Sequence, residues 1–232
     1  MQVLTGTSGF SYTAWRGSFY PEKLAEAKML AYYAERLRTV EINNSFYRMP
    51  SPEALGKWAA ETPPSFHFAL KSPRRITHEK KLADVGDSLQ RLEQAARTLG
   101  DKLGPILFQL PPFLRKDLPR LDDFLAALPA GLRAAMEFRH ESWFSDDVYD
   151  RLRARGAALC IAESEDLATP TVATAGWGYL RLRRQDYDRA AVAAWAERIR
   201  AQPWDIAYVF FKHEDEGRGP ALATDLAGMM IP

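Results

Sequence analysis

Short apolar runs alternate with amphipathic stretches from one end of the chain to the other. Eight runs have the length and the β-branched or aromatic content of buried strands. Six stretches between them carry apolar residues at helical spacing. The predicted strands are 2–8, 39–46, 66–72, 105–111, 133–139, 158–164, 178–184 and 205–212, and the predicted helices are 27–37, 51–61, 85–99, 118–128, 146–156 and 189–200.

This alternation predicts one domain over residues 1–232, an α/β fold of the (β/α)8 TIM-barrel type. Segment 165–177, between the sixth and seventh strands, has no helical pattern and is expected to be an irregular loop. An open doubly wound sheet is the alternative. It is disfavoured because the stretch GTSGFS after the first strand opens no helical pattern.

Segment 39–46, TVEINNSF, carries polar residues on one face of a strand that otherwise reads as buried. Val40 and Ile42 alternate with Glu41 and Asn43. In a barrel, alternate side chains lie under the helices or point inward, so Glu41 and Asn43 are expected inside, near the C-terminal mouth. Because a buried carboxylate needs a partner, we expect Lys71 on the next strand to pair with Glu41.

Most other predicted strands also end in polar or charged residues. A single such residue is usually solvated, whereas a ring of them at one end of a barrel favours a functional site. The ring consists of Lys71, Gln109, Glu137, Arg139, His140, Glu163, Tyr179, Arg181, Arg183 and either Lys212 or His213. Glu137 and Arg139 are expected on one face of the fifth strand, and Tyr179, Arg181 and Arg183 occupy alternate positions of the seventh.

The loops beside this ring are rich in aromatic residues, which suits a wall for stacking against a sugar ring or a base. After the last strand, Gly217 and Gly219 flank Arg218, a pattern typical of an anion site at a helix N-terminus. The negative charges of the acidic run 214–216 would repel an anion at this position. The loop aromatics are Phe10, Tyr12, Trp15, Phe19, Tyr20, Phe46, Tyr47, Trp143 and Phe144.

Composition narrows the classes of partner. With 232 residues, 47% hydrophobic and 26% charged, the chain reads as globular. A net charge of +1 does not indicate a nucleic-acid partner. A nucleic-acid-binding surface would have to be a local basic patch. The single cysteine, Cys160, excludes a disulfide framework. No signal-peptide pattern and no run of roughly 20 apolar residues is present, so we expect a cytoplasmic protein without a membrane partner; the oligomeric state stays open.

Five blocks together resemble the YecE-like family, the domain of unknown function 72. They are GTSGFSYTAWRGSFYP, TVEINNSFYRMPSPE, FALKSPRRITHEKKL, LGPILFQLPP and EFRHESWF, and the match covers nearly the whole chain in order. The resemblance implies a (β/α)8-type barrel and no established biochemical activity. The polar positions it carries over are Tyr12, Trp15, Glu41, Asn43, Lys71, Thr77, His78, Gln109, Glu137, Arg139, His140, Ser142 and Trp143.

The last third departs from the family pattern. Many members read Arg-Leu-His-Gly in the seventh strand, where this chain has Arg181, Leu182, Arg183 and Arg184. Many end the eighth strand with Phe-Asn-Asn, where this chain has Phe211, Lys212 and His213, and Glu163 stands where Asp is frequent. The resemblance therefore does not imply a shared substrate.

Three functions fit this ring of residues. The first is an acid/base hydrolase or lyase acting on a small sugar-like, phosphorylated or nucleotide-like ligand. In it Glu41 and Glu137 divide the acid and base roles: Lys71 or Arg139 keeps one carboxyl ionised, and burial keeps the other protonated. Carboxyls ~5–10 Å apart would suit glycoside-type chemistry.

The second function is a metal-dependent isomerase or nuclease-like enzyme, with a divalent metal on Glu41, Glu137, Glu163 and His213. Cationic residues in the ring oppose it. The third is non-catalytic binding of a small anionic or sugar-like ligand.

The predicted catalytic residues are Glu41, Glu137 and Lys71. The predicted substrate-binding residues are Tyr12, Trp15, Asn43, His78, Gln109, Arg139, His140, Trp143, Arg181 and Lys212. No metal site and no cofactor are predicted.

Overall fold

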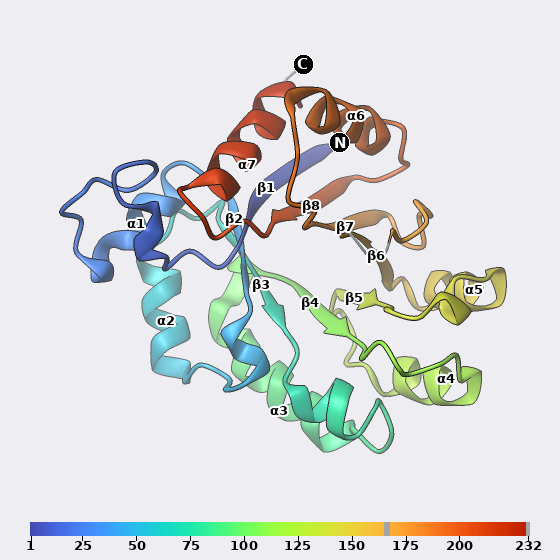
Figure 1. The fold of residues 1–232 in the computed structure, drawn as a ribbon. Helices are drawn as coiled ribbons and strands as arrows, with labels where there is room; N and C mark the ends of the chain where they lie inside the picture. Colours follow the sequence, from blue (N-terminus) through green and yellow to red (C-terminus); the bar gives the residue numbers. More distant parts are fainter. Residues whose placement is uncertain (165–167, 231–232) are drawn as a thin grey trace.

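The computed structural model describes residues 1–164 and 168–230 and shows a closed barrel of parallel strands (Figure 1). The strands pair in sequence order, and β8 pairs with β1 to close the barrel. The predicted (β/α)8 architecture is confirmed, and the open sheet is wrong. The strands are β1 Gln2–Ser8, β2 Thr39–Ile42, β3 His67–Lys71, β4 Leu103–Gln109, β5 Ala134–Glu137, β6 Ala158–Glu163, β7 Trp177–Leu182 and β8 Ile206–Phe211.

Helices surround the barrel and follow most strands (Figure 1). Between β6 and β7 the described residues contain no helix, which agrees with the irregular link expected there. No helix in the described part of the chain is long and apolar enough to cross a membrane. The α-helices are α1 Met29–Ala34, α2 Pro52–Ala60, α3 Gly86–Ala96, α4 Leu118–Ala127, α5 Asp146–Arg155, α6 Arg189–Arg200 and α7 Arg218–Met229.

Two strands that matter for the site end earlier than predicted. Strand β2 stops at Ile42, and a 3-10 turn, Asn44–Phe46, follows it. Strand β5 stops at Glu137, and a similar turn covers Glu141–Trp143. Asn43 and Arg139 therefore lie beyond strand ends. The expectation that Arg139 shares a strand face with Glu137 is wrong, because the strand alternation has already ended.

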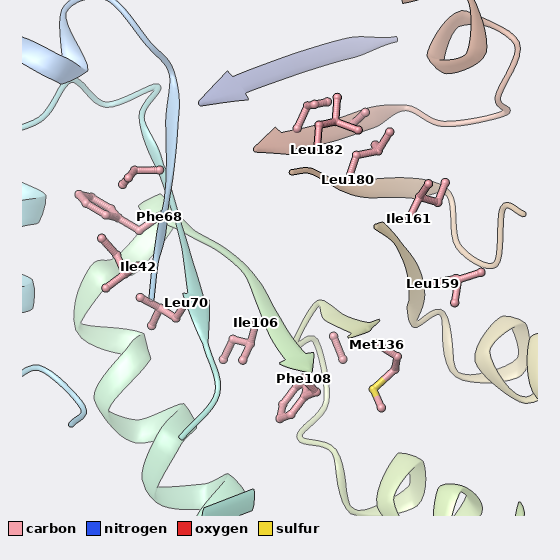
Figure 2. Packing of buried hydrophobic residues seen from close by; sticks show 14 of the residues in the cluster. Ile42, Phe68, Leu70, Ile106, Phe108, Met136, Leu159, Ile161, Leu180 and Leu182 are labelled. Carbon is pink, nitrogen blue, oxygen red and sulfur yellow. The ribbon is translucent and has the colours of Figure 1, made fainter. Parts of the chain in front are cut away.

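Strand residues alternate between two apolar layers. Outward-facing side chains such as Phe68, Ile106 and Leu180 pack between the strands and the helices (Figure 2). The barrel interior holds a second, smaller cluster. Several of its members are small, including Ala69, Ala135 and Ala162. Small interior residues leave space for long side chains from other strands, and polar residues fill that space at the C-terminal end.

Candidate functional site

Arg181 lies between two buried carboxylates near the C-terminal ends of the strands. Its Nη1 donates to Glu137 Oε2 at 2.7 Å, and its Nη2 donates to Glu41 Oε1 at 2.9 Å. The three side chains come from β7, β5 and β2. Arg181 is 2% exposed, and both glutamates are 0% exposed. The expected Glu41–Lys71 ion pair is not formed, because the arginine from β7 occupies that position instead.

Glu41 has further partners on several elements. Its Oε1 accepts from Ser8 Oγ at 2.7 Å and from Asn43 Nδ2 at 3.1 Å, and its Oε2 accepts from the Tyr179 hydroxyl at 2.7 Å. These bonds explain the polar face of segment 39–46. Glu41 points into the barrel as predicted, and Asn43 bonds to it from the turn after the strand.

Glu137 has its own set of donors. Gln109 Nε2 donates to Oε1 at 2.8 Å, and Arg183 Nη2 donates to the same oxygen at 3.1 Å. Arg183 follows the end of β7, and its side chain is 15% exposed. Two arginines thus hold Glu137, and the outer one extends the network toward solvent.

Both carboxyl groups are ionised in this arrangement. Burial, the largest influence, raises the pKa of Glu137, but Arg181 and Arg183 outweigh it and lower that pKa to about 2. Burial likewise raises the pKa of Glu41, while Arg181 and the hydrogen bond from Tyr179 bring it below its ordinary value. The expected division into one ionised and one protonated carboxyl is therefore wrong, because one buried cation serves both groups.

Lys71 lies at the edge of this network. Its Nζ donates to Gln109 Oε1 at 2.9 Å and lies 4.2 Å from the centre of the Phe46 ring. The side chain is only partly buried. Burial and the charge of Arg181 lower the pKa of Lys71 to about 8. An amine in this setting carries and releases protons closer to neutral pH than an exposed lysine does.

The two predicted tryptophans do not line the site. Trp15 and Trp143 are 1% and 0% exposed, so they belong to the core. Their indole N–H groups donate to the backbone carbonyls of Glu214 and Leu114 at 2.9 and 2.8 Å. Tyr12 lies closer to the network: its hydroxyl donates to the carbonyl of Ser8 at 2.7 Å, and burial followed by the charge of Glu214 raises its pKa to about 12. The expected aromatic wall is thus mainly core packing.

The other predicted binding residues lie around the mouth. His78 packs against Phe46 with ring centres 4.9 Å apart. Burial, followed by the charge of Lys71, lowers the pKa of His78. His140 Nδ1 accepts from the backbone N–H of Ser142 at 3.1 Å and so caps a turn. Arg139 is half-buried beyond β5, and Lys212 is exposed, with its ammonium 3.9 Å from Glu214.

The residues considered for a metal do not converge. Glu163 faces the helices, where its Oε2 accepts from Tyr187 and Trp195 at 2.6 and 3.0 Å. Arg181 occupies the space between the other two carboxylates. Among residues 1–164 and 168–230, no group of three His, Cys, Asp or Glu residues is placed to hold a metal ion. The donor set of the alternative hypothesis therefore does not fit a divalent cation.

A cavity of about 740 Å³ opens at the ends of β7 and β8. Arg183, Lys212 and Arg218 line it together with acidic residues such as Asp186. Arg183 belongs both to this cavity and to the buried network. Another cavity, of about 650 Å³, lies at the opposite end of the barrel, beside the start of β3 and away from the network.

Sequence reasoning missed Ser8 as a site residue and did not assign the phenol of Tyr179 a role. Both donate to Glu41. The available signal was position: each falls on the inward face of its strand, Ser8 at the end of β1 and Tyr179 two residues before Arg181. A polar inward residue near a barrel mouth is a candidate wherever its strand alternation is clear.

Comparisons with known proteins agree with this architecture. The sequence model described as "Protein of unknown function DUF72" matches residues 4–231. UPF0759 protein YecE of Escherichia coli K12 is 30% identical over 125 residues, 53% of this chain and 46% of that protein. UPF0759 protein YunF of Bacillus subtilis 168 is 27% identical over 176 residues, 70% of this chain and 62% of that protein. These matches span less than two thirds of either relative.

A solved structure shares the fold over its full length. The crystal structure of a DUF72 family protein from Thermotoga maritima superimposes with a TM-score of 0.84 and 24% identity, covering 99% of both chains. A DUF72 family protein from Enterococcus faecalis gives a TM-score of 0.79 at 18% identity, covering 99% of this chain and 95% of that one. At these identities the likeness shows the fold alone.

Proposed function

Since the chain belongs to the DUF72 family, whose function is unknown, we propose a function from its own site. The C-terminal mouth of the barrel binds a small anionic molecule and acts on it by acid–base chemistry centred on Lys71. Glu41 and Glu137 are positioning residues in this proposal. They hold Arg181 in place and do not touch the ligand themselves.

One observation carries the proposal: both carboxylates of the network are buried, whereas two of its three cations reach solvent. Glu41 and Glu137 are 0% exposed, whereas Arg183 and Lys71 are partly exposed. The network contains three cations, Arg181, Arg183 and Lys71, and two carboxylates, so one positive charge remains uncompensated within it. A ligand entering the mouth therefore meets positive charge in a partly desolvated setting, which favours an anion.

The chemistry follows from which groups exchange protons near neutral pH. Glycoside-type hydrolysis needs a protonated carboxyl as general acid, and the pKa values of both carboxyls here are lowered. Lys71, with a pKa of about 8, can both accept and release a proton near neutral pH. Lyase-type chemistry, in which a proton is removed next to a carbonyl group, suits this site better than hydrolysis.

A binding experiment tests the anion site. Calorimetric titration with inorganic phosphate and with pyruvate is expected to show binding, whereas neutral glycerol shows none. Lys71→Met and Arg183→Met should each weaken anion binding by about tenfold or more, corresponding to about 1.4 kcal/mol. Lys57→Met is the matched control, because the Lys57 side chain on α2 is 65% exposed. Equal binding of glycerol, or unchanged affinity in both site variants, would contradict the proposal.

A turnover experiment separates catalysis from binding alone. Pyruvate in deuterated buffer is followed by proton NMR, and the protein is expected to accelerate loss of the methyl signal as deuterium enters. The acceleration should disappear in Lys71→Met and persist in Lys57→Met. Anion binding without any such exchange would leave a binding protein and remove the catalytic part of the proposal.

A further inference from the structure

Lys71 differs from the other cations of the network in its contacts. Arg181 and Arg183 are each paired with a carboxylate. Lys71 forms no ion pair with any carboxylate in the described residues; its ammonium contacts a neutral amide, Gln109, and an aromatic face, Phe46. Neither partner opposes loss of the proton as strongly as a carboxylate does.

The placement of Lys71 also gives access to a ligand. It is the last residue of β3, at the end of the barrel where the positively charged mouth lies. Its side chain is partly exposed, while the carboxylates are fully buried. Partial desolvation and neighbouring cations both favour the unprotonated amine of a lysine. If that amine can also be reached from solvent, it can act as a nucleophile.

We propose that Lys71 is a nucleophilic lysine that forms an imine with a small carbonyl compound bearing a carboxylate, a 2-oxo acid. This inference rests on the proposed anion site, because the uncompensated positive charge at the mouth is what would hold the carboxylate. It extends that proposal by naming the covalent step and the class of substrate.

The step balances without any further reactant. The Nζ lone pair attacks the carbonyl carbon, a C–N bond forms, and the C=O π electrons move to oxygen. A proton lost from nitrogen and one gained by oxygen give the neutral carbinolamine. The nitrogen lone pair then expels the hydroxyl group as water, with a proton supplied to it, and the C=N bond remains. His78, which packs against the same Phe46 ring, is a neutral base suited to moving these protons.

The proportion of free amine supports reactivity at neutral pH. With a pKa of about 8, roughly one in ten Lys71 side chains is unprotonated at pH 7, against roughly one in 2,500 for an ordinary lysine. A low-pKa amine is intrinsically a weaker nucleophile, so the gain in rate is smaller than the gain in free amine.

Reductive trapping tests the inference on the full chain. The protein is incubated with glyoxylate and sodium cyanoborohydride at neutral pH, and adducts are located by peptide mass spectrometry. Early in the reaction, Lys71 should be modified at least about tenfold faster than any exposed lysine, in keeping with its larger free-amine fraction. Lys71→Arg keeps the charge but cannot form an imine, so it should lose this fast adduct while retaining the same melting behaviour. Uniform modification of all lysines would overturn the inference.

A neutral aldehyde separates the imine from the anion site. Glycolaldehyde resembles glyoxylate in size but lacks the carboxylate. The two proposals together predict fast trapping of glyoxylate at Lys71 and slower trapping of glycolaldehyde there. Equally fast trapping of both would support the nucleophilic lysine and contradict the anion site. Phosphate binding that depends on Lys71 and Arg183, with no selective trapping, would support the anion site and reject the imine.

Discussion

Replacing Arg181 with methionine removes the cation that two buried carboxylates share. Methionine keeps most of the length and volume of the side chain, so loss of charge and of hydrogen bonds dominates over loss of packing. Glu41 then retains only neutral donors, and Glu137 retains Arg183 at 3.1 Å. The variant therefore tests whether the fold depends on this arginine.

The expected loss of stability is large. Breaking a buried ion pair by removing one member costs about 3–5 kcal/mol, because the remaining charge stays uncompensated. Arg181 serves two carboxylates, but Arg183 still supports one of them, so the upper part of that range, about 4–5 kcal/mol, is expected. Domains have total stabilities of about 5–15 kcal/mol, so the variant should be marginally folded.

The pH dependence should change sign at the same time. In the parent protein the pKa of each carboxyl is lowered, so both groups stabilise the folded state fully at pH values above their unfolded pKa. This stabilisation is lost only as the pH falls through the folded pKa, which is about 2 for Glu137. Without Arg181, burial raises the pKa of Glu41 above its unfolded value. The folded state then binds more protons, and the variant should be more stable at about pH 5 than at about pH 8.

Urea denaturation followed by tryptophan fluorescence, at both pH values, measures the two effects. Arg153→Met is the matched control, because Arg153 is a half-exposed residue on α5 that forms a surface ion pair with Asp150; the variant should lose less than about 1 kcal/mol. If Arg181→Met does not fold, the triple variant with Glu41→Gln and Glu137→Gln should recover folding by removing both orphaned charges. A loss below about 1 kcal/mol for Arg181→Met, without reversal of the pH trend, would refute the reasoning.

Two other predictions concern the barrel around the site. Tyr33→Phe removes a buried hydroxyl that accepts from the backbone N–H of Thr7 at 2.8 Å and donates to the carbonyl of Thr39 at 2.9 Å. It should lower the free energy of unfolding by about 2–3 kcal/mol in urea titrations, and a loss below about 0.5 kcal/mol would contradict this role. Burial, followed by the charge of Glu137, raises the pKa of the Cys160 thiol, so Ellman's reagent should react with it only after denaturation. Rapid labelling of the folded protein would show that the barrel interior is open.

The sequence by itself determined the elements and their order. Strand and helix periodicities predicted a (β/α)8 barrel because each pattern depends on neighbours a few residues away. Helix ends depend on equally short-range contacts: the Ser51 side chain accepts from the N–H of Ala54 at 3.2 Å, and Gly156 ends α5 in the left-handed conformation at φ 69°. Inward-facing polar residues such as Glu41 and Arg181 followed from alternation along single strands.

Only the tertiary structure decided how those inward residues pair. Lys71 is on the strand next to Glu41, which made it the expected partner, but barrel closure brings a side chain from β7 to the carboxylates of β2 and β5. An arginine that spans the interior offers several donors at once, which a lysine cannot match. The burial of Trp15 was equally non-local, since its indole N–H donates to the carbonyl of Glu214, in the segment that follows β8. Partners across a closed barrel are far apart in sequence and in sheet order, so no local pattern records them.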